Sequence, residues 1–136
     1  MHQSIHVVAA VIRAEGRYLC ARRKPEKSMG GYWEFPGGKV EPGELPGKAL
    51  ERELVEELNL EVAVGDKLGE TVTGVDPKIL LEFYECELPY RIEVHSTDHD
   101  RIVWLPREEL LSLEWAAADL PFVQRFVKSH LWPPGL

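Results

Sequence analysis

Apolar and β-branched residues gather in short runs along the first part of the chain. The runs "IHVVAAVI" (5–12) and "RYLCARR" (17–23) are separated by "RAEG", in which Gly16 supplies a turn residue. Two such runs joined by a short glycine-containing segment are typical of antiparallel strands. The pattern therefore predicts a β-hairpin over residues 5–23.

The second half of the chain repeats the strand pattern and then changes to helical spacing. Residues 60–74 and 78–88 are predicted strands joined by a turn at "VDPK", and "RIVWL" is a short strand that ends at Pro106. "REELLSL" predicts a short helix, and the apolar spacing of 119–131 predicts a terminal helix. Mixed strands with at least two helices predict an α/β or α+β sandwich.

Between these halves, a long loop leads into a helix with an unusual charge pattern. Residues 23–44 are rich in glycine and proline, and long structured loops in compact proteins tend to be functional. Pro46 suits the first turn of a helix that is expected to end near Leu58. Asn59 follows it, at a position where a left-handed residue commonly ends a helix.

Three glutamates of this helix crowd one side. At 3.6 residues per turn, Glu53, Glu56 and Glu57 project within an arc of ~100°, whereas leucines 50, 54 and 58 form a separate stripe for the core. Arg52 can reach Glu56 and is expected to relieve only one of the three. The pattern fits either a solvated acidic face or a divalent cation bound by hard oxygen ligands, and spacing alone favours neither.

Composition narrows the function classes. The 136 residues predict one domain over 1–136, and the net charge of −7 argues against a nucleic-acid-binding surface. No apolar run is long enough to span a bilayer, and the first residues lack the pattern of a signal peptide. Cys20 and Cys86, each in a predicted strand, are interpreted as buried free thiols, so a cytoplasmic protein is expected.

The segment "GKVEPGELPGKALERELVEELNL" (38–60) resembles the Nudix box, the signature of the Nudix hydrolase family. Every specified position of that motif is matched except one, where Asn59 replaces a glycine. The residues at matching positions are Gly38, Glu44, Arg52, Glu53, Leu54, Glu56, Glu57 and Leu60. The resemblance implies a Nudix-like α/β/α sandwich with a mixed central β-sheet, and it places metal chemistry ahead of a solvated acidic face.

What the resemblance further implies is Mg²⁺-dependent hydrolysis, with Mn²⁺ able to substitute. In such enzymes metal ions bridge a pyrophosphate and the glutamate cluster, and water attacks phosphorus. The implied metal ligands are the carbonyl of Gly37, then Glu53, Glu56, Glu57 and Asp98. Arg52 and Glu44 would support the carboxylates, and Glu53 or a loop carboxylate such as Asp98 would take the proton.

Outside the box, "ARR", "YWEFPGGK" and "DHDRIVWLPREEL" resemble the MutT-type, CTP pyrophosphohydrolase-like branch. That branch cleaves a (deoxy)nucleoside triphosphate to the monophosphate and pyrophosphate. The implied nucleotide contacts are Arg23, Phe35, Gly38, Lys39 and Asp119. Phe35 could equally fill the core, and Asp119 is also placed to cap the last helix. An aspartate at that position leaves 8-oxo-dGTP, CTP, dCTP and a modified dCTP all open.

Several alternatives remain at the level of sequence. Asp98 is one methylene shorter than the family's glutamate, so water-mediated contact with metal is an alternative to direct ligation. His95 and His99 are interpreted as surface histidines, because the implied metals prefer oxygen. A non-catalytic nucleotide-binding module, or a hydrolase of ADP-ribose or a dinucleotide, competes with the triphosphate hydrolase. A nucleotide is the expected partner, with no stable nucleic-acid complex and no membrane, in a monomer or homodimer.

Overall fold

The structure, a computed structural model, describes residues 4–129 and is built on a seven-stranded sheet. Strand β1 (Ser4–Ala14) lies at its centre, paired in parallel with β6 and antiparallel with β2 and β4. The remaining pairings, β2 with β3 and β7 and β5 with β6, are antiparallel. The strand bounds are β2 Arg17–Arg23, β3 Trp33–Glu34, β4 Gly37–Lys39, β5 Val64–Thr73, β6 Lys78–Glu87 and β7 His99–Pro106.

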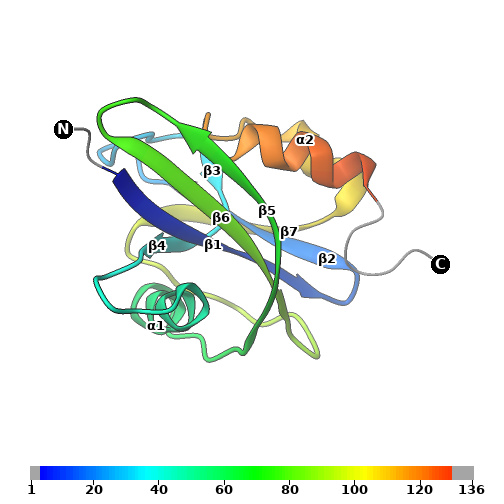
Figure 1. Cartoon of the computed structure of the whole chain (residues 1–136). Coiled ribbons are helices and arrows are strands. Elements are labelled where there is room, and N and C mark those ends of the chain that lie inside the picture. The colour runs from blue at the N-terminus through cyan, green and yellow to red at the C-terminus, as the bar shows by residue number, and fades with distance from the viewer. Residues whose placement is uncertain (1–3, 130–136) are drawn as a thin grey trace.

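Helices cover both faces of the sheet, as Figure 1 shows, with α1 (Pro46–Leu58) on one side and α2 (Leu120–Lys128) on the other. A 3-10 helix, η1 (Arg107–Ser112), precedes α2. Each face has its own apolar cluster, one under α1 and one under α2. The predicted class, an α/β/α sandwich with a mixed central sheet, is therefore confirmed.

Helix α1 forms where the sequence predicts it, and its apolar stripe fixes its orientation. Pro46 opens the helix, and Leu50, Leu54 and Leu58 are buried against the sheet. Asn59 ends it in the left-handed conformation, with φ 52°, and the N–H of Leu60 bonds back to the carbonyl of Leu54. Asparagine tolerates this conformation, so the substitution of the motif glycine leaves the helix end intact.

Aromatic rings fill the space beneath α2. Phe122 stacks on Phe83 with ring centroids 4.1 Å apart, and Phe126 meets the edge of Tyr18 at 5.3 Å. Phe35 belongs to this cluster as well, 4.7 Å from the ring of Trp115. These contacts anchor α2 and the loop before it, which carries Asp119, to the sheet.

The predicted hairpin turn is confirmed, whereas the type or the bounds of three other predicted elements differ in the structure. The β1–β2 hairpin turns at Glu15 and Gly16, both at positive φ, as "RAEG" predicts. The segment "REELLSL" forms a 3-10 helix, and β7 begins at His99 rather than at Arg101. The predicted helix over 119–131 ends at Lys128, and residues 130 and 131 lie outside the described part of the chain.

Both cysteines are buried and free, as expected, and burial raises the pKa of the Cys86 thiol to about 12. Among the helices of residues 4–129, none is long and apolar enough to cross a bilayer.

Candidate active site

Arg52 organises the exposed part of the acidic helix. Its guanidinium donates to both carboxylate oxygens of Glu44, from Nε at 2.8 Å and from Nη2 at 2.9 Å. Its Nη1 donates to Glu53 at 3.0 Å and to Glu56 at 3.1 Å. The prediction that Arg52 relieves only one of the three glutamates is thus wrong, because one planar guanidinium presents five N–H donors in a fixed fork.

Glu44 is the best satisfied of these carboxylates. Besides Arg52, the backbone N–H of Glu41 donates to it at 2.9 Å. The hydrogen bonds from Arg52 and from Glu41 lower the pKa of Glu44 to about 2. Glu44 therefore stays ionised throughout the physiological range and holds Arg52 in place.

Glu53 lies against a glycine that leaves it room. A Cβ built on Gly38 would overlap the Glu53 carboxylate, and one on Gly37 would overlap the carbonyl oxygen of Val8. The Glu53 side chain is 19% exposed. Burial raises its pKa, against the opposing effect of Arg52. The "GG" of strand β4 thus brings the helix carboxylate and the sheet backbone to close approach.

Glu57 turns inward, unlike Glu56. The Glu57 side chain is 8% exposed, whereas that of Glu56 is 58% exposed. Burial, together with the charges of Glu34, Asp98 and Glu53, raises the pKa of Glu57 to about 8. The ionised form of Glu57 is therefore disfavoured in the metal-free site, and a divalent cation would stabilise it, so the donor set of hard oxygens fits Mg²⁺ or Mn²⁺.

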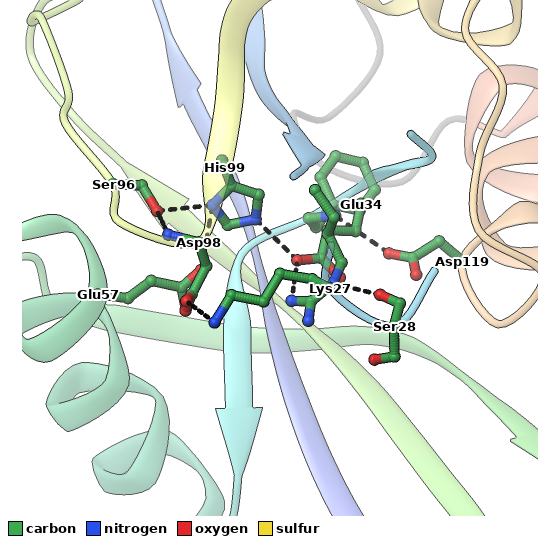
Figure 2. Close-up of polar contacts among 10 residues, drawn as sticks. Lys27, Ser28, Glu34, Glu57, Ser96, Asp98, His99 and Asp119 are labelled. Carbon is green, nitrogen blue, oxygen red and sulfur yellow. Dashed lines mark hydrogen bonds and ion pairs between the residues drawn. The ribbon is translucent and has the colours of Figure 1, made fainter. Parts of the chain in front are cut away.

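Glu34 and His99 complete this inner cluster, as Figure 2 shows. His99 Nε2 lies 2.8 Å from Glu34, and its Nδ1 lies 3.4 Å from Glu57. The His99 side chain is fully buried, so its interpretation as a surface histidine is wrong. His95 is 85% exposed in its side chain, as expected. Sequence reasoning missed both Glu34 and His99, although Glu34 stands inside the quoted "YWEFPGGK".

A cavity of about 540 Å³ opens beside the acidic cluster. That volume falls within the range typical of small-molecule sites. Its wall combines a few charged groups with apolar and backbone surface. The predicted nucleotide contacts Arg23, Phe35, Gly38, Lys39 and Asp119 all line it, as do Gly37 and Glu34. The structure therefore brings the predicted substrate residues to one place, next to Glu53 and Glu57.

The Asp119 side chain does not cap helix α2, contrary to the prediction. It occupies the N-cap position of α2, but its backbone is helical, with φ −85° and ψ −33°, and its side chain makes no capping bond. Instead, the backbone N–H of Phe35 donates to its Oδ2 at 3.1 Å. Asp119 is 5% exposed, and burial raises its pKa to about 8. Burial therefore favours the protonated form of this carboxyl group, and Asp119 lines the cavity.

Phe35 and Asp98 have more than one contact each. Phe35 is 3% exposed and packs in the aromatic cluster, so its core-filling role is confirmed, and the residue is also among those that line the cavity. The Asp98 side chain is 39% exposed and lies 3.3 Å from Lys27. Asp98 also adds to the negative potential at Glu57, which places it at the edge of the same cluster.

A match to the NUDIX domain over residues 2–126 shows that the chain belongs to the Nudix hydrolase family, as the motif predicts. The CTP pyrophosphohydrolase of Escherichia coli (strain K12) is 37% identical over 124 residues, covering 90% of this chain and 91% of that protein. The 8-oxo-dGTP diphosphatase of Proteus vulgaris is 46% identical over 61 residues, covering 44% of this chain and 54% of that protein.

The fold agrees with this assignment. The solution structure of the E. coli ORF135 protein superimposes with a TM-score of 0.84 at 34% identity, covering 99% of this chain and 96% of that one. Nudix hydrolases generally use divalent metal ions. The cluster of Glu34, Glu57 and His99 groups its ligand atoms within 4.8 Å of one another, a spacing that could hold an ion.

Proposed function

We propose that this protein hydrolyses a nucleoside triphosphate to the nucleoside monophosphate and pyrophosphate in the presence of Mg²⁺. CTP, dCTP and 8-oxo-dGTP are the candidate substrates, in keeping with the names of its relatives. The observation that carries the proposal is the position of two part-buried carboxylates, Glu53 and Glu57, beside a cavity lined by Arg23 and Asp119.

Each group has a separate task in this proposal. Glu53 and Glu57 would hold the ions, with Glu56, Asp98 and the Gly37 carbonyl completing the ligand set. When bound, a divalent ion supplies charge neutralisation of the phosphate chain and lowers the pKa of the attacking water. Arg52 and Glu44 keep the Glu53 carboxylate aimed across Gly38. Glu53 or Asp98 would accept the water's proton.

The cavity would take the base and sugar. Its apolar wall includes Phe35 and Leu81, and Arg23 and Lys39 supply positive charge near the acidic cluster. Asp119 accepts from the Phe35 N–H through one oxygen, and burial favours its protonated form, in which the other oxygen would donate to an acceptor on the base. Cytosine and guanine both carry such an acceptor, so this contact is compatible with all the candidate substrates.

The test is product identification with a nucleotide panel. The wild type with Mg²⁺ should release pyrophosphate, without orthophosphate, from CTP, dCTP or 8-oxo-dGTP. Glu57→Gln and Glu53→Gln should lose turnover, whereas Glu61→Gln, at an exposed position just beyond the helix, should keep it. Turnover of ADP-ribose or a dinucleotide alone would move the protein to another substrate class. Tight nucleotide binding with no turnover would favour the non-catalytic module.

A further inference from the structure

His99 is a buried group to which the proposed reaction gives no role. It stands at the start of β7, where it pairs with Arg23 of β2 across a β-bulge. Its imidazole lies between the loop that carries Asp98 and the strand that carries Glu34 (Figure 2). A fully buried imidazole in contact with carboxylates needs hydrogen bonds at both nitrogens, since an unmade bond is costly there.

Hydrogen bonds run from His99 in both directions. On one side, the backbone N–H of Asp98 donates to Ser96 Oγ at 3.2 Å, and Ser96 Oγ lies 2.7 Å from His99 Nδ1. On the other, His99 Nε2 lies 2.8 Å from Glu34 Oε2. With the proton on Nε2, each group in this series of hydrogen bonds has a matching role. Ser96 donates to Nδ1, and Nε2–H donates to the Glu34 carboxylate.

The series of hydrogen bonds continues from Glu34 to the wall of the cavity. Arg23 donates from Nη1 to the same Glu34 oxygen at 3.3 Å and from Nε to the carbonyl of Ser28 at 2.8 Å. Arg23 and Ser28 both line the cavity. The residue after Arg23 is also bonded to the Asp98 loop, because the backbone N–H of Lys24 donates to the carbonyl of Asp98 at 3.1 Å. Hydrogen bonds thus link the loop of Asp98 to Arg23, which lines the cavity.

Direct ligation of a metal is the competing role for His99. Its nitrogens lie near Glu34 and Glu57 in a group that could hold an ion. However, one nitrogen already faces Ser96 and the other faces Glu34, and Mg²⁺ prefers oxygen ligands. A metal-binding histidine would have to give up one of these bonds, so the geometry favours an organising role.

We infer that His99 is a positioning residue that couples the Asp98 loop to Arg23 through Glu34, and so sets how Arg23 meets the nucleotide. The inference rests on the proposed function for the identity of the ligand. It adds a residue that touches neither substrate nor phosphate. Loss of the His99–Glu34 bond would free Glu34 and Arg23 to move and weaken nucleotide binding more than it slows the chemical step.

Two substitutions separate the ends of the imidazole. In His99→Gln the amide nitrogen can reach the position of Nε2 and keep a donor for Glu34. In His99→Asn the shorter amide reaches only the position of Nδ1, so the bond to Glu34 is lost while Ser96 keeps a partner. His95→Asn, on the exposed part of the same loop, is the matched control. Thermal unfolding checks that every variant is folded.

The expected result is a split between KM and kcat. His99→Asn should raise the nucleotide KM about tenfold or more with a smaller change in kcat, and His99→Gln should restore much of the loss. Metal-free binding of CMP and of 8-oxo-dGMP should weaken in the same order, which gives a readout independent of turnover. Arg23→Ala combined with His99→Asn should cost less than the sum of the single effects, because both act through one contact.

Other outcomes overturn the inference. Equal KM values for wild type and folded His99→Asn would show that Glu34 and Arg23 hold their positions unaided. Loss of Mn²⁺ binding in both His99 variants, with unchanged binding of CMP and 8-oxo-dGMP, would make His99 a metal ligand instead. Fully additive effects with Arg23→Ala would break the link to that residue. Failure of the proposed function is distinct, because the wild type would then turn over none of the nucleotides.

Discussion

The guanidinium of Arg52 forms a bidentate contact with the Glu44 carboxylate, with Nε 2.8 Å from one oxygen and Nη2 2.9 Å from the other. Its remaining donors reach Glu53, Glu56 and the carbonyl of Lys39. A loop residue, a helix and strand β4 are therefore joined through one side chain. In the proposed enzyme these contacts would hold the carboxylates of Glu44, Glu53 and Glu56 in place in the absence of metal.

Replacement of Arg52 by lysine should lower activity about 10- to 100-fold, although the positive charge is kept. A lysine ammonium cannot form the bidentate contact with Glu44 and reach Glu53 at the same time. The measurement is kcat as a function of Mg²⁺ concentration. Arg13→Lys, whose partner Glu87 is exposed and distant from the site, serves as control and should behave like the wild type. Full activity in Arg52→Lys would contradict the organising role.

Gly38→Ala should abolish most turnover while the protein remains folded. The new methyl group would overlap the Glu53 carboxylate, which can swing away only by leaving the position beside the cavity. Gly47→Ala is the matched control, because its Cβ would meet only a methyl of Val64 at 3.8 Å. That helical substitution should be neutral or stabilise by up to ~1 kcal/mol. Equal activity in the two variants would show that the position of Glu53 is unimportant.

Substitutions of Asp119 test how the base is read. Asparagine can accept from the Phe35 N–H and donate with its amide nitrogen, which reproduces the hydrogen bonds of a protonated aspartate. Asp119→Asn should therefore keep the KM for the preferred nucleotide within a few-fold. Asp119→Ala should raise that KM about 10- to 100-fold, the equivalent of roughly 1–3 kcal/mol for a lost buried hydrogen bond. A severe loss in Asp119→Asn alone would indicate that the ionised carboxylate binds the base.

The pKa of Asp119 also predicts a pH dependence of stability. Because its folded pKa is raised to about 8, the folded protein holds a proton that the unfolded chain releases near pH 4. This contribution to the free energy of unfolding is fully present below about pH 4 and falls as the pH rises to about 8. Its slope is at most about 1.4 kcal/mol per pH unit.

Urea unfolding of the wild type and of Asp119→Asn between about pH 4 and pH 8 measures the contribution of Asp119 to the free energy of unfolding. As the pH rises from about 4 to about 8, the wild type should lose free energy of unfolding relative to Asp119→Asn. A difference that is constant across the range would show that Asp119 is ionised in the folded protein.

The sequence predicts the fold and the helix face well because both depend on local patterns. The leucine stripe of α1, the left-handed Asn59 and the "RAEG" hairpin follow from periodicity and turn chemistry. The Nudix box is a contiguous motif, so the family could be identified from it. That the chain is a single domain, and the individual roles of the site residues, stay predictions.

The inner cluster could not be predicted because it depends on a bulge. Ile102 and Trp104 of β7 pack in the cluster under α1, so strict alternation would place Asp100 on that face and His99 on the other. The register shift opposite Arg22 and Arg23 breaks the alternation and turns His99 toward Glu57. Likewise, only the tertiary contact with Phe35 reveals that Asp119 does not cap α2.

The most direct test of the account is the binding of Mn²⁺, followed by electron paramagnetic resonance, in wild type, Glu57→Gln and Glu61→Gln without nucleotide. The account predicts that wild type and Glu61→Gln bind the ion with similar affinity and that Glu57→Gln binds it at least about tenfold more weakly. Undiminished binding by folded Glu57→Gln would contradict the claim that this buried carboxylate holds the metal.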